Sequence, residues 1–300
     1  METGAGRMVS LGNAYFRQRM AELQYSIVIP AYNEQARIGA TLKGVLDCVA
    51  RRNWAAEVLV VNDGSSDKTA QIVRSVAASH PEVRLIENSR NRGKGYSVRN
   101  GILQARAPIV MFTDADLSSP MEEAELLFSA LADGADVAIG SRWLERKRQT
   151  IRQPLYRRFF GRCFNGCTRL VMGLPFADTQ CGFKAFRREA AQEIFTRQRI
   201  ERWGFDPELL FIALRHGLRV REVPVTWGHD ERSRIGYLRD GMQMMQEIAR
   251  IRWNALTGIY DRENLQSALN GAGCSCSGGC AKSRPEIRPP AAAVKLDAKR

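Results

Sequence analysis

Residues Pro108–Asp116 of this 300-residue chain have the sequence PIVMFTDAD. The continuous apolar run Pro108–Thr113 is typical of a strand that is buried on both faces, and two carboxylates follow it closely. Two earlier segments repeat this arrangement: YSIVIP at Tyr25–Pro30 leads into AYNE, and EVLVVN at Glu57–Asn62 leads into DGSSD. Buried strands that alternate with helical patterns predict an α/β fold, in which helices flank a mostly parallel, Rossmann-like sheet.

Further elements continue this alternation along the chain. More strands are expected at 83–87, 136–140 and 219–225, and helices up to about residue 52 and at 68–79, 94–105, 121–132, 206–215 and 237–258. The last of these is amphipathic and rich in Met, Ile and Arg, and its spacing favours packing against the core. We expect three regions: an N-terminal arm at 1–23, one large domain at 24–260, and a flexible tail at 261–300.

Parallel sheets bind ligands beyond the carboxyl ends of their strands, so the residues after each strand are site candidates. These segments are Tyr32–Glu34, Asp63–Asp67, Arg90–Gly95 and Asp114–Asp116. Two carboxylates one residue apart at the end of a buried strand are costly unless they are neutralised. Such a pair is often only a surface turn. Its place in register with the other acidic strand exits favours a site for a hard divalent cation at Asp114 and Asp116.

The other strand exits allow both a structural and a ligand-binding interpretation. Asp63 could head a turn in which Ser66 or Asp67 caps the next helix, and it could also accept hydrogen bonds from a nucleotide base or ribose. The loop Arg92–Gly95 is either a simple basic loop or a phosphate site, where glycine permits close approach and Lys94 supplies charge. No G-x-G-x-x-G follows the first strand, which argues against an NAD enzyme.

The charge of the chain favours an anionic partner. Lys and Arg number 45 against 32 Asp and Glu, which gives a formal net charge of +13. Between residues 142 and 169 nine basic side chains accompany one acidic residue and five aromatic ones. This stretch could dock on an anionic membrane surface, or be a solvated basic helix. Single-stranded nucleic acid is a weaker alternative, because no nucleic-acid module accompanies the stretch.

Hydropathy and cysteine usage indicate the compartment. The chain has no run of about 18 apolar residues and no apolar signal region at its start, so we expect neither a transmembrane helix nor export by that route. Seven scattered Cys do not resemble a disulfide framework. The sequence therefore predicts a cytoplasmic protein, with peripheral attachment to the inner face of the membrane as a variant.

The cysteines fall into two groups. Four are expected to be core or near-core thiols: Cys48, Cys163, Cys167 and Cys181. Three form a C-x-C-x₃-C pattern in the tail: Cys274, Cys276 and Cys280. Three soft ligands could bind zinc or copper(I), or pair by oxidation, although no fourth ligand lies nearby in the sequence.

Seven motifs occur in one order along the chain. They are YSIVIPAYNE, VVNDGSSD, NRGKG, FTDAD, AIGSR, DTQCGFKAF and WGFDPELL, at residues 25–34, 60–67, 91–95, 112–116, 138–142, 178–186 and 203–210. In this order they resemble the family 2 glycosyltransferases of GT-A fold. The last two motifs are similar to those of the polyprenyl-phosphate (dolichyl-phosphate) hexose synthases, particularly the glucosyltransferase branch. The resemblance covers roughly residues 25–255.

The resemblance implies a donor site for a nucleoside-diphosphate sugar, which in this branch is UDP-glucose. The residues that it implies around the nucleotide are Pro30, Tyr32, Glu34 and Asp63. Asp114 and Asp116 would hold Mg²⁺ or Mn²⁺ against the donor diphosphate, and Lys94 is the candidate phosphate contact. Relatives often carry Gln where this chain has Ser118, so a third side-chain ligand is not implied.

The resemblance also implies residues for the acceptor, a polyprenyl or dolichyl phosphate. Arg142 and one of Arg157 or Arg158 would grip the acceptor phosphate. Arg232 or Arg234 would close over the donor from a mobile loop. Transfer would proceed with inversion and without a covalent intermediate.

The kind of acceptor decides whether a general base is needed. An attacking alcohol needs one, whereas a phosphate monoester is already largely ionised at neutral pH, since its second pKa is about 6. Asp206 stands where other family 2 enzymes often place a base. It could equally cap a helix that begins at Pro207, with Glu208 as a favourable first-turn charge. Asp206 and Arg142 are therefore the catalytic candidates.

Three functions remain open on this evidence. The first is transfer of a hexose, glucose in the branch resembled, to a lipid phosphate. The second is transfer by the same fold to a hydroxyl group of a small molecule or glycan. The third is a non-catalytic module that binds nucleotide sugars.

Overall fold

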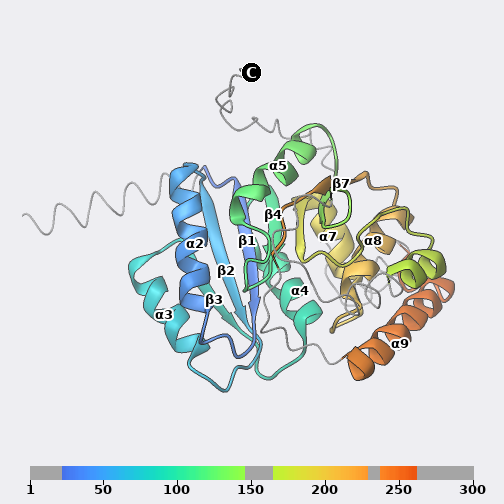
Figure 1. The fold of residues 1–300 in the computed structure, drawn as a ribbon, viewed down its shortest axis with the longest axis horizontal. Coiled ribbons are helices and arrows are strands. Elements are labelled where there is room, and N and C mark those ends of the chain that lie inside the picture. The colour runs from blue at the N-terminus through green and yellow to red at the C-terminus, as the bar shows by residue number, and fades with distance from the viewer. Residues whose placement is uncertain (1–21, 146–164, 229–236, 262–300) are drawn as a thin grey trace, which may run out of the picture.

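In the computed structural model the described strands form one sheet, in the order β3-β2-β1-β4-β6-β5-β7 (Figure 1). The structure describes residues 22–145, 165–228 and 237–261. The strands are β1 (Tyr25–Ala31), β2 (Ala56–Asn62), β3 (Val83–Glu87), β4 (Ile109–Thr113), β5 (Val137–Ser141), β6 (Phe183–Arg187) and β7 (Val220–Pro224). Each runs parallel to its neighbours except β6, which is antiparallel to β4 and β5. The predicted mostly parallel α/β fold is confirmed.

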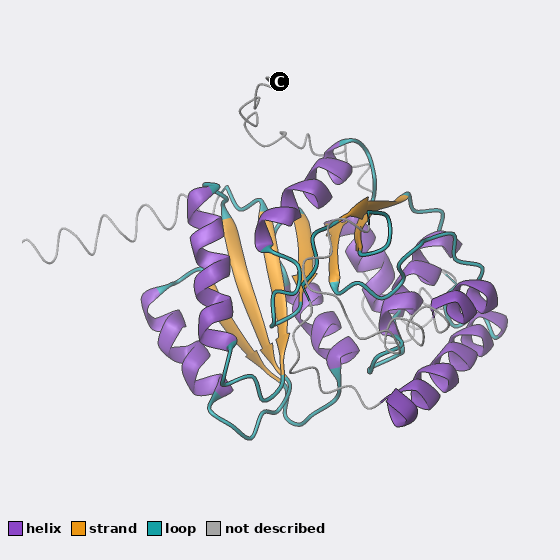
Figure 2. Ribbon diagram, viewed as in Figure 1, coloured by secondary structure: helices purple, strands orange, loops and turns teal. Residues whose placement is uncertain are grey.

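Helices cover both faces of this sheet (Figure 2). They are α2 (Ile38–Arg51), α3 (Thr69–Ser79), α4 (Lys94–Gln104), α5 (Ala124–Ala132), α7 (Arg188–Arg197), α8 (Phe205–Arg215) and α9 (Tyr237–Leu256). A short 3₁₀ turn, η1 (Met121–Glu123), precedes α5, and residues 165–172 are also helical. One core contains side chains of α2, α3 and α5, and the other contains side chains of α4, α7, α8 and α9.

The apolar strands explain why two cores form. Ile27 and Ile29 of β1 belong to the core under α2, whereas Val28 between them belongs to the core under α4. Successive side chains of a strand point to opposite faces, so an unbroken apolar run fills both. On α2 the buried residues Leu42 and Val49 recur at helical spacing, which turns one stripe toward the sheet.

The sheet reverses its strand order next to β1, which lies between β2 and β4. Such a switch point opens a crevice beyond the carboxyl ends of the two strands in open α/β sheets. The loop at 32–34 follows β1, and the pair Asp114 and Asp116 follows β4. The fold therefore places two of the predicted site segments at this position.

Strand β6 was not among the strands predicted from the sequence. Because β6 is antiparallel to β4, its first residue Phe183 pairs with Thr113, the last residue of β4. The residues that precede β6 consequently lie at the same edge as those that follow β4. The motif that begins at Asp178 is brought to the candidate site in this way.

Helix α9 only partly fulfils the expectation that its Met and Ile residues pack against the core. Ile248 and Ile251 are buried, but Met242 is 65% exposed and Trp253 is 67% exposed. The helix therefore has one apolar face in the core and further apolar side chains on the surface.

Candidate active site

The loops after β1 and β2 are joined by hydrogen bonds between side chains and backbone. The N–H of Asn33, which has a φ of 55°, donates to Ser65 Oγ at 2.9 Å. The carboxylate of Asp67 accepts from the N–H of Gln35 at 3.1 Å and from that of Thr69, the first residue of α3, at 2.9 Å. These bonds fix the two loops against each other beside the switch point.

The predicted nucleotide residues of the first loop differ in their surroundings. Pro30 lies near the end of β1 and is half-buried. The Tyr32 side chain is 43% exposed, so its ring is accessible to a ligand. Glu34 forms an ion pair with Arg37, just before α2. Contact of any of these residues with a nucleotide stays a prediction.

Asp63 is buried and anchors the following loop. Its carboxylate accepts hydrogen bonds from Asn88 Nδ2 at 2.8 Å, from the N–H of Arg92 at 3.0 Å and from the N–H of Gly93 at 2.8 Å. Gly93 has a φ of 110°, a conformation that L-residues rarely adopt. Asp63 thus holds the loop that leads directly into Lys94.

The acidic pair after β4 is enclosed by specific contacts. Asp114 Oδ1 lies 2.5 Å from Lys94 Nζ, and the backbone of Gly182 lies so close that a Cβ there would overlap the Asp114 carboxylate. Asp116 Oδ1 accepts the N–H of Ser118 at 2.9 Å. Burial and then the charge of Asp114 raise the pKa of Asp116. Negative charge is concentrated at this turn.

This donor set fits a hard divalent cation. Two neighbouring carboxylates offer the oxygen ligands that Mg²⁺ and Mn²⁺ prefer. Within the described part of the chain no group of three or more His, Cys, Asp or Glu side chains is arranged to hold a metal. Water and oxygens of a bound diphosphate can supply further ligands to an ion at Asp114 and Asp116.

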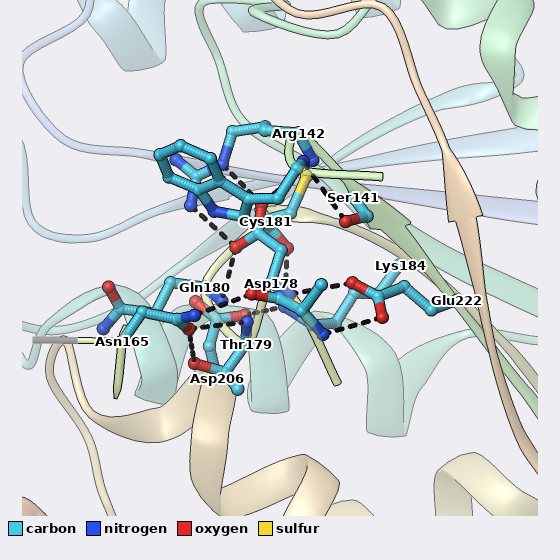
Figure 3. Close-up of polar contacts among 12 residues, drawn as sticks. Ser141, Arg142, Asn165, Asp178, Thr179, Gln180, Cys181, Lys184, Asp206 and Glu222 are labelled. Atoms are coloured by element: carbon cyan, nitrogen blue, oxygen red, sulfur yellow. Dashed lines mark hydrogen bonds and ion pairs between the residues drawn. The ribbon is translucent and has the colours of Figure 1, made fainter. Parts of the chain in front are cut away.

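A row of alternating charges continues inward from this turn. Burial alone would lower the pKa of Lys94, but Asp114 and Asp206 raise it above its usual value. Asp206 in turn forms an ion pair with the fully buried Lys184, whose Nζ also donates to the Cys181 carbonyl oxygen at 2.5 Å (Figure 3). Burial raises the pKa of Asp206, although Lys184 and Lys94 oppose this rise.

Arg142, directly after β5, is held by a second buried carboxylate (Figure 3). Asp178 accepts from Arg142 Nε at 2.6 Å and from its Nη2 at 2.8 Å. Burial would raise the pKa of Asp178, but Arg142 lowers it below its usual range. Glu222 of β7 accepts the N–H of Asp178 at 2.8 Å and so fixes its backbone. The guanidinium of Arg142 is therefore set in one orientation.

The capping alternative for Asp206 is wrong. The helix begins at Phe205 with Gly204 as its N-cap, and the Asp206 carboxylate pairs with Lys184 instead of capping the helix. Glu208 lies in the first turn as predicted, but its side chain is fully buried. Sequence reasoning placed both residues on the helix correctly but did not foresee their partners.

The thiol expectations are partly fulfilled. Cys48 and Cys181 are buried as expected, but Cys167 is exposed, so that expectation is wrong. Several predicted residues lie outside the described residues: Arg157, Arg158, Arg232, Arg234, Cys163, Cys274, Cys276 and Cys280.

Sequence reasoning did not assign roles to several residues that build the site. Lys184 lies in the apolar segment FKAF, and a lysine in such a segment indicates a buried ion pair because a buried ammonium needs a counter-charge. The counter-charge is Asp206. Asp178 and Gly182 were quoted only as parts of a motif. Glu222 carries no local signal, because its contact depends on the pairing of β7 with β5.

Comparison with known proteins agrees with this geometry. The family described as "Glycosyl transferase family 2" matches residues 26–195. The chain belongs to this family. The glycosyltransferase class predicted from the motifs is thereby confirmed. No helix in the described part of this family 2 chain is long and apolar enough to cross a bilayer.

Curated relatives of this family 2 glycosyltransferase support the predicted branch. A dolichyl-phosphate beta-glucosyltransferase of Trichomonas vaginalis is 37% identical, and the match covers 75% of this chain and 71% of the relative. The dolichyl-phosphate beta-glucosyltransferase of Homo sapiens is 32% identical, with coverage of 81% and 79%. The chain is similar to both over most of their length.

A solved structure shares the fold. Glucosyl-3-phosphoglycerate synthase from Mycobacterium tuberculosis in complex with UDP is 20% identical and superposes with a TM-score of 0.57, over 79% of this chain and 82% of that chain. Further structures of that synthase contain UDP with Mn²⁺ or Mg²⁺.

Proposed function

We propose that this glycosyltransferase transfers glucose from UDP-glucose to dolichyl phosphate, with inversion at the anomeric carbon. The observation that carries the proposal is the acidic turn at Asp114 and Asp116, with Lys94 Nζ 2.5 Å from Asp114. Such a turn can bind a cation and a diphosphate together, and it follows β4 at the switch point of the sheet. The names of the curated relatives support the choice of donor sugar and acceptor.

The donor nucleotide would bind over the loops after β1 and β2. The exposed ring of Tyr32 offers a surface on which a planar base can stack. Pro30, Glu34 and Asp63 belong to the same two strand exits and would complete the pocket. Arg232 or Arg234 would close over the donor.

Mg²⁺ or Mn²⁺ would be held by Asp114 and Asp116. Such an ion, when bound, neutralises charge on the departing diphosphate. Lys94 brings a positive charge of the protein to the same place, and its pairing with Asp114 orients its ammonium before the donor arrives.

The acceptor phosphate would bind at Arg142, with Arg157 or Arg158 as a further contact. Asp178 holds the Arg142 guanidinium in place, so the side chain loses little conformational freedom when a phosphate binds. The ionised phosphate needs no base. The Asp206 carboxylate is already engaged in an ion pair with Lys184, and an acceptor that needs no base is consistent with this arrangement.

We also propose that the protein docks peripherally on the cytoplasmic face of a membrane that contains anionic lipid. Helix α9 exposes apolar residues at helical spacing: Met242, Met245, Trp253 and Leu256. Arg250 and Arg252 on the same helix are also exposed and could meet lipid headgroups. In this proposal residues 24–260 form the glycosyltransferase domain, between the arm at 1–23 and the tail at 261–300.

The test is direct transfer by the full chain. The purified protein is incubated with radiolabelled UDP-glucose, Mg²⁺ or Mn²⁺, and vesicles that contain dolichyl phosphate. Label is expected in a lipid-extractable product with UDP-glucose and not with GDP-mannose. Asp116→Asn should abolish the product. Release of UDP without labelled lipid would contradict the proposal.

A hydroxyl acceptor is the competing function, and Asp206→Asn separates the two. Per folded protein, transfer to a phosphate should remain mostly intact in this variant, whereas transfer to an alcohol should fall by about 10²-fold for lack of a base. A loss of that size with dolichyl phosphate would show that Asp206 is needed in another way.

A further inference from the structure

Glu208 is a buried carboxylate that the proposed reaction does not use. It lies on α8 with its side chain fully buried. Its Oε1 accepts from the N–H of Arg199 at 2.9 Å and from Tyr260 Oη at 2.7 Å, and its Oε2 accepts from the N–H of Ile200 at 2.9 Å. Two consecutive backbone donors and one phenol hold a single carboxylate. Glu208 therefore fixes the start of the loop 198–204.

That loop is packed directly against the start of α4, whose first residue is Lys94. The N–H of Tyr96 donates to the carbonyl oxygen of Glu201 at 2.9 Å. Gln198 Nε2 donates to the carbonyl oxygens of Gly95 at 3.0 Å and of Ile200 at 2.8 Å. The two residues that follow Lys94 are thus tied by hydrogen bonds to residues 198–201.

Glycine on each side of Lys94 makes this contact tight. A Cβ at Gly93 would stand 2.6 Å from the Glu201 carbonyl oxygen, and one at Gly95 would stand 2.8 Å from the Ile200 carbonyl oxygen. Neither backbone can shift toward the other without a clash. A displacement of the loop 198–204 toward α4 would consequently push on the two glycines that flank Lys94.

We propose that Glu208 and Tyr260 are positioning residues that set the place of Lys94 through the loop 198–204. This inference rests on the proposed function, in which Lys94 contacts the donor diphosphate. The carboxyl group of Glu208 orders the two N–H groups, and Tyr260, which follows α9, orders the carboxyl group. The C-terminal end of the fold thereby supports the phosphate side of the donor site.

The test is a double-mutant cycle in the full chain. Glu208→Gln replaces one acceptor oxygen by an amide group, and kcat/KM for UDP-glucose is expected to fall about tenfold. In a Lys94→Ala background the same change should alter kcat/KM less than twofold, because the group through which Glu208 acts is gone. Additive losses would overturn the proposal.

Glu57→Gln is the matched control. Glu57 is also buried and accepts from Ser26 Oγ and from the N–H of Arg106, both at 2.7 Å. It lies near the start of β2, at the end of the strand opposite to the candidate site. This variant should reduce stability while leaving kcat/KM within twofold of wild type. An equal fall in kcat/KM in both variants would mean that Glu208 is merely structural.

Amide hydrogen exchange tests, without any transfer assay, the series of contacts that runs from Glu208 through the loop 198–204 to Tyr96, here called the contact chain. The Tyr96 amide is expected to exchange faster in Glu208→Gln, and also in the milder variant Tyr260→Phe, but not in Glu57→Gln. Unchanged Tyr96 protection would refute the inference even if the protein transfers glucose. Faster exchange in a protein that transfers no glucose would leave the contact chain standing and refute the proposed function instead.

Discussion

Three carboxylates of the site each have a cationic partner. Asp114 faces Lys94, Asp178 faces Arg142, and Asp206 faces Lys184. Removing one member of a buried pair leaves the other charge uncompensated, which costs far more than the loss of a surface pair. The site is therefore also a sensitive point for stability.

Lys184→Met should expose this cost. The change leaves Asp206 buried without its ion pair and is expected to lower the free energy of unfolding by about 3–5 kcal/mol. Lys43→Met is the control, because Lys43 pairs with Asp47 on the surface and its loss should cost about 1 kcal/mol or less. Urea titration of both variants gives the comparison. Equal losses would show that the buried Lys184–Asp206 pair contributes no more to stability than the surface Lys43–Asp47 pair.

Gly182→Ala should disturb the acidic turn itself. The new methyl group would occupy the space of the Asp114 carboxylate, so Mn²⁺-dependent binding of UDP-glucose should weaken by about tenfold or more. Gly241→Ala on α9 meets no atom within 4 Å and serves as the control, with binding unchanged. Calorimetry measures both. Normal binding by Gly182→Ala would separate Asp114 from the donor site.

At the scale of elements, the sequence predicted what depends on continuous local patterns. The apolar runs of β1, β2 and β4 and the spacing of α3, α4 and α8 lie within the observed elements or within a residue or two of them. Strand β6 was missed because its five residues carry no distinctive alternation. Its antiparallel place between β4 and β5 is set by pairing, which no local pattern encodes.

The same distinction applies to the site. Asp114 and Asp116 were found because they follow a buried strand directly. The partner of Asp206 was missed because Lys184 lies 22 residues away and meets it only through the pairing of β6. Glu208 was predicted only as a first-turn charge, because its position in the helix alone does not show its contacts with Tyr260 and with the loop 198–204.

The outer face of α9 gives a prediction about membrane binding. Leu256→Ser replaces a side chain that is 79% exposed and should reduce sedimentation with anionic vesicles. Leu103→Ser on α4, where the side chain is 41% exposed, is the matched control and should sediment like wild type. High salt should release both proteins, since arginine contacts with headgroups are screened. Equal sedimentation at low salt would remove α9 from the docking surface.

For the whole molecule, Glu208 links stability to pH. Burial raises its pKa to about 7, against the hydrogen bonds from Tyr260, Ile200 and Arg199 and the charge of Arg199. An unfolded Glu has a pKa of about 4.3, so the folded state binds this proton more tightly. The stabilisation is complete below pH about 4.3 and is lost as the pH rises through about 7.

Glu208→Gln should remove this contribution. The difference in unfolding free energy between wild type and variant is expected to change by up to about 1.4 kcal/mol per pH unit between pH 4.3 and 7, with wild type losing stability as the pH rises. Denaturant titrations across this range measure the difference. A difference that does not vary with pH would mean that Glu208 titrates as it does in the unfolded chain.

The donor site as a whole depends on a cation bound at the turn after β4. The most direct test is calorimetric titration of the full chain with UDP-glucose, in the presence and absence of Mn²⁺. We expect Mn²⁺ to tighten binding to the wild-type protein and to have no effect on Asp116→Asn. Equal affinity of the wild-type protein with and without Mn²⁺, or an undiminished response of Asp116→Asn, would contradict the account.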